Sequence, residues 1–248
     1  MSTILQVERL TRRFGGLTAV NAVSIDLNIG EVHAVIGTNG AGKSTLINML
    51  SGEIASSEGQ IRLADTEVTG QPQPRRALMG IGRSYQRTTI FPEFTVHENC
   101  RLAAQARTPR PWALWESARA CVASAQAADA ALEATGLAAE AARLAGTLSH
   151  GAKRQLEVAM CLATQPRVLL LDEPLAGMGA EETDRMLALL ERLKPDHAIL
   201  LVEHDMDAVF RVAERITVMV NGAVIASGSP DAIRNDPLVR TAYLGTEN

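Results

Sequence analysis

A glycine-rich loop between an apolar strand and a helix places the strongest constraint on how this chain of 248 residues can fold. Val32–Ile36 is a short apolar run, and Gly37–Thr45 follows it with the sequence GTNGAGKST. This segment matches the pattern G-x-x-x-x-G-K-[ST]. Leu46 and Leu50 then lie on the apolar stripe of a helix that is expected to end near Gly52. A buried parallel strand, a phosphate-binding loop and a helix are therefore predicted in that order.

The residue types in the loop suit the binding of a nucleotide. Glycines let the backbone wrap around phosphate oxygens with N–H groups pointing inward, and the helix N-terminus adds partial positive charge. Lys43 is expected to reach the β and γ phosphates, and the Ser44 hydroxyl can ligate Mg²⁺. The candidate nucleotide-binding residues of the loop are Thr38, Asn39, Gly40, Ala41, Gly42, Lys43, Ser44 and Thr45.

A second apolar run, Val168–Leu171, ends in the acids Asp172 and Glu173. A buried strand would carry Asp172 to the phosphate site, where it can hold Mg²⁺ directly or through water. Glu173 would then polarise the attacking water as a general base. Such a run is also found where a strand merely enters a loop, but its position downstream of a phosphate loop favours the catalytic interpretation.

The remaining pattern predicts an α/β core with a helical insertion. Residues 93–164 are rich in alanine and are expected to form two or three helices, with 107–111 (RTPRP) as a loop. One helix begins at the motif Leu148–Gln155, with Ser149 as its N-cap, although an ordinary capped helix has the same pattern. The other expected elements are strands 4–10, 20–27, 168–172, 198–202, 216–220 and 223–227, helices 180–193 and 205–213, a turn at 221–222 and two short helices within 230–245.

Composition excludes several classes of protein. Hydrophobic residues make up 46% of the chain and charged residues 21%, so a disordered or fibrous chain is excluded. The formal net charge of −4 gives no sign of a nucleic-acid partner. No apolar run approaches the 20 or so residues of a membrane span, and no signal peptide is evident at the N-terminus. The three dispersed cysteines suit a reducing compartment.

The order and spacing of the motifs resemble those of the ATP-binding subunits of ABC transporters over essentially the whole chain. The resemblance implies one nucleotide-binding domain over 1–248, with a P-loop NTPase (RecA-like) core that carries an antiparallel β subdomain and an inserted α-helical subdomain. The implied bounds are 1–92 and 165–228 for the core, 93–164 for the helical subdomain and 229–248 for a helical tail. The motifs that carry it are 37–45, Gln86, 148–152, 169–173 and His204.

This resemblance also implies roles for individual residues. Phe14 would stack on adenine, Gln86 would sense Mg²⁺ and the membrane partner, and His204 would act as the switch histidine. Ser149 and Gly151 would contact the γ-phosphate bound to the opposite subunit. The implied catalytic residues are thus Lys43, Gln86, Glu173 and His204, and the implied ligands of Mg²⁺ are Ser44, Gln86 and Asp172.

Two positions depart from the common family pattern. The motif usually reads LSGGQ, whereas this chain has His150 and Ala152 at its third and fifth positions. Ala152 lacks the amide that would reach toward the facing nucleotide. The aromatic residue is Phe14 rather than the more usual tyrosine, and stacking does not need the hydroxyl.

Within the family, the chain looks like the larger ATPase of branched-chain amino acid importers. The similarity lies in LSHG at 148–151, EPLAGM at 173–178, and the ending DPLV and AYLG at 236–245. It implies a smaller sibling ATPase as heterodimer partner, with a homodimer as the alternative, together with two permease subunits and a substrate-binding protein. It also implies a peripheral position on the cytoplasmic face of the cell membrane.

Other functions fit the sequence less well. Related importers for urea, short amides or aromatic acids share the same motifs and remain alternatives. Soluble ABC ATPases of DNA repair or translation carry long coiled coils or tandem domains, and lipopolysaccharide transport ATPases have a different tail. A GTPase would need Asn-Lys-x-Asp, but residues 193–196 read LKPD. A small-molecule kinase would lack the Ser149 motif, and a pure binding protein would not need Glu173.

Overall fold

A six-stranded sheet forms the centre of the structure. The structure is a computed structural model, and it describes residues 2–86, 89–107 and 121–244. Its strand order is β10-β9-β3-β8-β7-β6, and all neighbours are parallel except β10, which pairs antiparallel with β9. The strands are β3 (Glu31–Gly37), β6 (Ile81–Arg83), β7 (Val168–Asp172), β8 (Ala198–Val202), β9 (Arg215–Val220) and β10 (Ala223–Gly228). Every residue of β3, β7 and β8 is buried, as expected for parallel strands covered on both faces.

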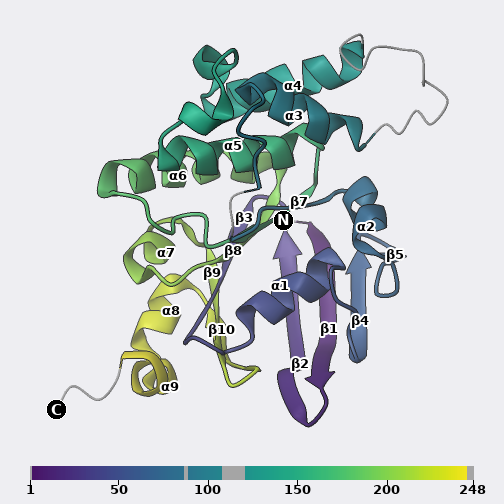
Figure 1. Ribbon diagram of the computed structural model, residues 1–248. Coiled ribbons are helices and arrows are strands. Elements are labelled where there is room, and N and C mark those ends of the chain that lie inside the picture. The colour runs from purple at the N-terminus through teal and green to yellow at the C-terminus, as the bar shows by residue number, and fades with distance from the viewer. Residues whose placement is uncertain (1, 87–88, 108–120, 245–248) are drawn as a thin grey trace.

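A second, antiparallel sheet has the order β2-β1-β4-β5 and comes from the N-terminal part of the chain. Its strands are β1 (Thr3–Phe14), β2 (Leu17–Asn28), β4 (Glu58–Leu63) and β5 (Thr66–Glu67). Helix α1 (Lys43–Ser51) packs between the two sheets, with Leu46 and Leu50 in one apolar cluster with residues from both (Figure 1). Gly42 precedes the helix with φ of 99°, and a Cβ there would lie 2.4 Å from the Ala19 carbonyl oxygen, so only glycine fits.

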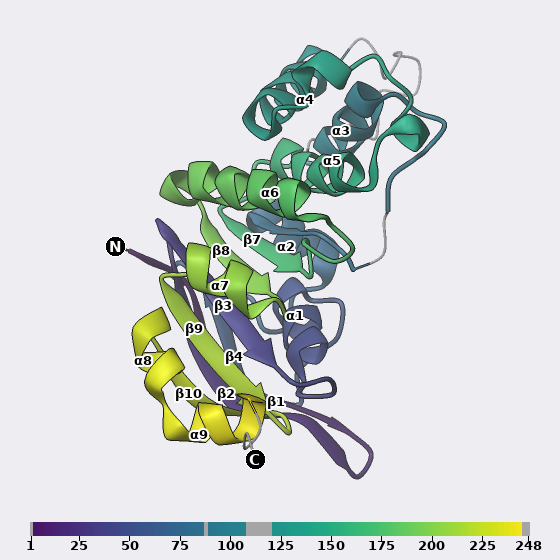
Figure 2. The ribbon, with the colours of Figure 1, turned by 90° about the vertical axis from the view of Figure 1, so that its left-hand side faces the viewer.

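Further helices cover the opposite face of the six-stranded sheet. Apolar residues of α6 (Ala180–Leu193) and α7 (Met206–Val212) pack on β7 and β8, and α8 (Pro230–Asn235) and α9 (Pro237–Val239) pack near β9 and β10 (Figure 2). A π-helical turn at Arg240–Leu244 follows α9, and α2 (Gln73–Met79) precedes β6. Within the described part of the chain, no helix has both the length and the apolar character needed to cross a bilayer.

Three helices form a separate apolar cluster at one end of the molecule (Figure 2). They are α3 (Val96–Gln105), α4 (Val122–Thr135) and α5 (His150–Ala163), and 3₁₀ turns lie at Ala138–Glu140 and Ala145–Thr147. Thr95 and Glu98 form a capping box at α3, and Ser149 caps α5 as predicted, because its Oγ accepts the N–H of Ala152 at 3.2 Å. The proposed division at 92 and 165 stays a prediction, and most of the predicted loop 107–111 lies outside the described residues.

The alternation predicted after residue 165 is confirmed. Helix 180–193 and strands 168–172 and 198–202 have the predicted bounds. The predicted turn between β9 and β10 also forms, with φ of 48° at Asn221 and 80° at Gly222. The helix predicted from Asp205 begins one residue later, because the Asp205 carboxylate caps it by accepting the N–H of Ala208 at 3.1 Å.

Arg76 of α2 joins two layers of this fold from a position that is only 1% exposed. Its guanidinium donates to the Met49 and Leu50 carbonyls at the end of α1, at 2.7 and 2.9 Å. It also donates to the carbonyls of Thr69 and Gln71, at 2.8 and 2.9 Å. One side chain thus donates to four buried or partly buried carbonyls.

We expect Arg76→Ala to lower the free energy of unfolding by about 3 kcal/mol, because four carbonyls would lose a charged donor and a void would remain. Urea unfolding followed by circular dichroism measures the change. Arg75→Ala, an exposed neighbour on the same helix, should change stability by less than about 0.5 kcal/mol. Equal stabilities for the two variants would contradict the assignment.

Candidate functional site

The glycine loop and the ends of the central strands surround a cleft of about 630 Å³. Most of the residues that the sequence analysis assigned to a nucleotide lie around it, although they come from distant parts of the chain. Those that line it are Phe14, Asn39, Gly40, Ala41, Gly42, Lys43, Ser44, Thr45, Gln86 and Glu173. The sequence did not predict its other lining residues, among them Thr18 and Asn221.

Lys43 is folded back into its own loop. Its Nζ donates to the carbonyl oxygens of Gly37 at 2.7 Å and Thr38 at 3.2 Å. Burial lowers the pKa of Lys43, while the nearby charges of Glu173 and Asp172 act in the opposite direction. The ammonium group therefore sits at the base of the cleft, where phosphate oxygens could replace the carbonyls as its partners.

Asp172 ends β7 beneath the loop and is almost fully buried. Its Oδ2 lies 3.5 Å from a guanidinium nitrogen of Arg83, a residue that the sequence analysis did not identify. Its Oδ1 is buried with no hydrogen-bond partner among the residues that the structure describes. Burial raises the pKa of Asp172 and the charge of Glu173 raises it further, while Arg83 and Lys43 lower it.

Glu173 follows Asp172 in a conformation that non-glycine residues seldom adopt, with φ of 50°. Its N–H donates to the Val202 carbonyl of β8 at 2.9 Å, which fixes the backbone at the strand end. The Nε2 of Gln86 donates to its Oε2 at 2.8 Å. The structure thus places Gln86 against the candidate general base, 87 positions away in the sequence.

His204 is not among the residues that line the cleft; its side chain is 60% exposed. The buried Glu203 beside it, which the sequence analysis missed, connects two loops. Its Oε1 accepts the N–H of Leu175 at 2.8 Å, and its Oε2 accepts the N–H of His204 at 3.1 Å. Its adjacency to His204 was the available sequence signal, but only the fold shows that it reaches the loop after β7.

Ser149 and Gly151 lie away from the cleft, on a second groove of about 620 Å³. The groove also contains Glu182 of α6, whose Oε1 accepts the Ser149 hydroxyl at 3.2 Å and the Gly151 N–H at 3.1 Å. A Cβ at position 151 would lie 2.5 Å from the Glu182 Cδ, so glycine permits this approach. A carboxylate therefore occupies the anion-binding end of α5.

Phe14 lies at the edge of the cleft with 46% of its surface exposed. The guanidinium carbon of Arg12 sits 4.5 Å from the centre of its ring, a cation–π contact. Arg12 also donates to the Ala55 carbonyl at 2.9 Å, so the arginine is held in place. The aromatic ring is thus supported on one face and available at the entrance of the cleft.

Comparison with known proteins identifies the family. The family model described as "ABC transporter" matches residues 20–176, more than half of the chain. The model described as "Branched-chain amino acid ATP-binding cassette transporter" matches residues 223–247. The chain therefore belongs to the ABC transporter family as an ATP-binding subunit, and the predicted fold class, a P-loop NTPase core with β and α-helical subdomains, is confirmed.

Individual relatives support this assignment, and the similarity extends over nearly their full length. The chain is 42% identical to the high-affinity branched-chain amino acid transport ATP-binding protein BraF of Pseudomonas aeruginosa, with 98% of each chain covered. It is 41% identical to the corresponding LivG protein of Escherichia coli, again with 98% of each covered. Among solved structures, it resembles an ATP-binding cassette of an ABC transporter in its ADP conformation, with a TM-score of 0.86, 29% identity and coverage of 99% and 100%.

Proposed function

We propose that this chain hydrolyses ATP to drive a membrane importer of branched-chain amino acids. The observation that carries the proposal is the full-length identity of 41–42% to BraF and LivG, together with the match of residues 223–247 to the branched-chain model. Related importers for urea, short amides or aromatic acids remain the alternative substrates, because the proposed role of this subunit involves ATP and not the cargo.

The proposed site binds ATP in the cleft around the glycine loop. Residues 38–45 would surround the phosphates with backbone N–H groups, and Lys43 would exchange its carbonyl partners for phosphate oxygens. Phe14 would stack on the adenine at the entrance. This arrangement uses the charge of the helix N-terminus and the lysine to offset the charge of the triphosphate.

The residues at the base of the cleft also fit Mg²⁺. The buried Oδ1 of Asp172, which has no hydrogen-bond partner among the described residues, is the kind of hard oxygen that this cation prefers. Asp172 is not itself among the residues that line the cleft, whereas Ser44 is. Gln86 is proposed as a further ligand through its amide oxygen, because its Nε2 is the atom that donates to Glu173. When bound, the ion would neutralise charge on the phosphates during hydrolysis.

Glu173 is proposed to act as the general base. It lies on the cleft, and its backbone is held by β8, so its carboxylate is positioned to accept a proton from a water that attacks the γ-phosphate. Gln86, already hydrogen-bonded to that carboxylate, would orient it. His204, which follows β8 and is not among the residues that line the cleft, is proposed as the switch histidine. Hydrolysis then depends mainly on positioning and charge stabilisation.

The separation of Ser149 and Gly151 from the cleft supports a two-subunit site. Because they line a different groove, they would serve a nucleotide held by another ATPase subunit packed head-to-tail against this one. We propose a sibling ATPase as that subunit, with a homodimer as the alternative. Two permease subunits and a substrate-binding protein would complete the importer, with this chain peripheral at the cytoplasmic face of the membrane.

In this scheme the carboxylate of Glu182 occupies the place that the γ-phosphate must take. We expect Glu182→Gln to strengthen the ATP-dependent association of the two ATPase subunits by about tenfold, because a competing charge is removed while the side-chain size is kept. Sedimentation with and without ATP measures the dissociation constant. Glu181→Gln, an exposed neighbour, should leave it unchanged, and weaker association of Glu182→Gln would contradict competition with the phosphate.

The substrate is tested by uptake of radiolabelled leucine in the source cells, comparing wild type with Lys43→Ala at the native locus. We expect the variant to lose leucine uptake, and unlabelled valine to compete with leucine in the wild type, because loss of the phosphate ligand stops the ATPase. Unlabelled urea and benzoate should not compete. Unchanged leucine uptake in the variant would contradict the proposed substrate, and labelled urea, amides and aromatic acids would be tested next.

A further inference from the structure

Two buried side chains of α5 hold the segment that carries Gln86. Arg154 donates through Nη1 to the Tyr85 carbonyl at 3.0 Å and through Nη2 to the Gln86 carbonyl at 2.6 Å. Three residues further along the helix, Glu157 accepts the N–H of Thr89 through Oε1 at 2.8 Å. The backbone around Gln86 is therefore attached to α5 at three points.

Arg154 and Glu157 also pair with each other, through Nη1 and Oε2 at 2.9 Å, and their side chains are only 8% and 4% exposed. A buried ion pair is seldom more stabilising than an apolar pair of the same volume, because both charges lose water. The hydrogen bonds to the backbone of Tyr85, Gln86 and Thr89 are contacts that an apolar pair could not make. Burial raises the pKa of Glu157, and the hydrogen bonds from Thr89 and Arg154 oppose that shift.

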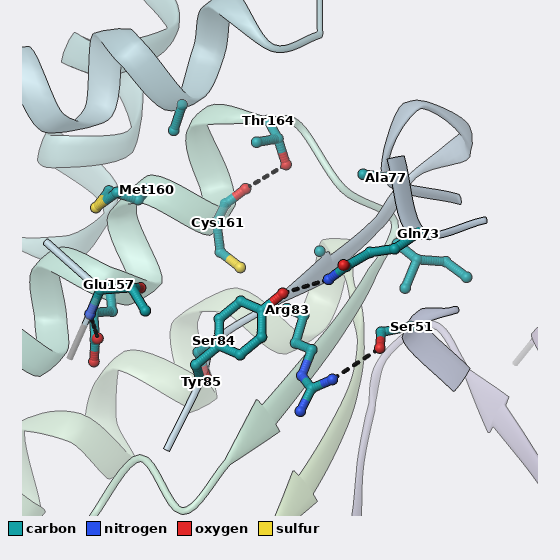
Figure 3. A pocket seen from close by; sticks show the side chains of 14 residues that line it. Ser51, Gln73, Ala77, Arg83, Ser84, Tyr85, Glu157, Met160, Cys161 and Thr164 are labelled. Carbon is teal, nitrogen blue, oxygen red and sulfur yellow. Dashed lines mark hydrogen bonds between the residues drawn. The ribbon is translucent and has the colours of Figure 1, made fainter. Parts of the chain in front are cut away.

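The side chain of Tyr85 connects the same segment to the core. Its hydroxyl accepts a hydrogen bond from Gln73 of α2, and its ring lies 4.7 Å from the guanidinium carbon of Arg83 (Figure 3). Arg83 in turn donates to Ser51 of α1 at 2.9 Å. Tyr85 therefore has its backbone bound to α5 and its side chain bound to the core, beside a groove of about 230 Å³ lined by Glu157, Arg83 and Tyr85 itself.

These contacts form a continuous physical connection through α5. The helix is capped at its N-terminus by Ser149, which is proposed to touch the nucleotide of the other ATPase subunit. Arg154 attaches the helix to the Gln86 backbone, and Glu157 attaches it to Thr89. The Gln86 Nε2 in turn donates to Glu173 in the cleft of this chain. Movement of α5 would consequently displace the Gln86 backbone relative to the candidate general base.

We propose that Arg154 and Glu157 are positioning residues that set Gln86 against Glu173 and make hydrolysis in this chain respond to the nucleotide that Ser149 contacts in the opposite site. Neither side chain lines the cleft, so Arg154 acts through the Gln86 backbone, and Glu157 acts through Thr89 and through its ion pair with Arg154. This inference rests on the proposed function of the chain as one ATPase of a two-site importer.

The test replaces the pair with apolar residues of similar size, Arg154→Met with Glu157→Leu, in the purified importer with its other subunits. This variant keeps the buried volume and removes the contacts to Tyr85, Gln86 and Thr89. We expect kcat for ATP to fall by about tenfold while KM for ATP stays within about twofold, because positioning is lost and binding is retained. A rise in KM beyond about twofold, or a kcat at the wild-type value, would overturn the inference.

A matched control removes another ion pair that lies away from α5. Glu31 and Arg215 pair at 2.6 Å between β3 and β9, and Arg215→Met with Glu31→Leu should leave kcat and KM unchanged. Hydrogen exchange supplies a readout without catalysis. The Thr89 amide should exchange about tenfold faster in the Arg154/Glu157 variant than in the wild type, because it loses its buried acceptor. Unchanged exchange would show that Glu157 does not hold the segment.

The response of ATP turnover to leucine distinguishes a failure of this inference from a failure of the proposed function. In the wild-type importer, binding protein loaded with leucine should stimulate ATP turnover. In the Arg154/Glu157 variant, the ratio of stimulated to unstimulated turnover should be about fivefold lower than in the wild type. Full stimulation of the variant would count against coupling through α5. A wild-type importer that ignores leucine would instead contradict the proposed substrate alone, because neither the kinetic split nor Thr89 exchange involves leucine.

Discussion

Three neighbouring parallel strands end at one edge of the central sheet, and the candidate binding and catalytic residues follow these strand ends. Strand β3 leads into the glycine loop, β7 ends at Asp172, and β8 is followed by Glu203 and His204. Because these strands are buried on both faces, their ends have little freedom to move. A buried carboxylate and a lysine ammonium can therefore be held beside a flexible ligand at fixed positions.

The loops beyond the strands are joined by hydrogen bonds. Glu203, which is 0% exposed, accepts from Leu175 and His204 and so ties the loop after β7 to the loop after β8. Burial raises the pKa of Glu203, and the two N–H donors and His204 lower it. Gln86 approaches the same edge from the segment that α5 holds. The cleft thus receives groups from the strand ends and from a segment that is held by α5 of the helical cluster.

Local sequence patterns predicted most strands and helices and the phosphate loop, because apolar periodicity, caps and turn residues act over a few positions. The N-cap at Ser149 and the turn at Asn221-Gly222 are examples. The pattern did not predict α2 with its buried Arg76, nor the contact between Glu182 and Gly151. Those depend on partners that lie 26 to 31 positions away, and no local signal records which side chains will meet. The residue roles drawn from family resemblance remain predictions.

We propose that Glu173 activates the water that cleaves ATP, and Glu173→Gln isolates this role because the substitution removes the basic carboxylate while nearly keeping the size of the side chain. In the purified importer, we expect ATP turnover to fall by about 100-fold or more while ATP stays bound and the ATPase subunits stay associated. Bound nucleotide recovered from the complex should be ATP rather than ADP. Hydrolysis at the wild-type rate, with ADP recovered, would show that Glu173 is not the general base.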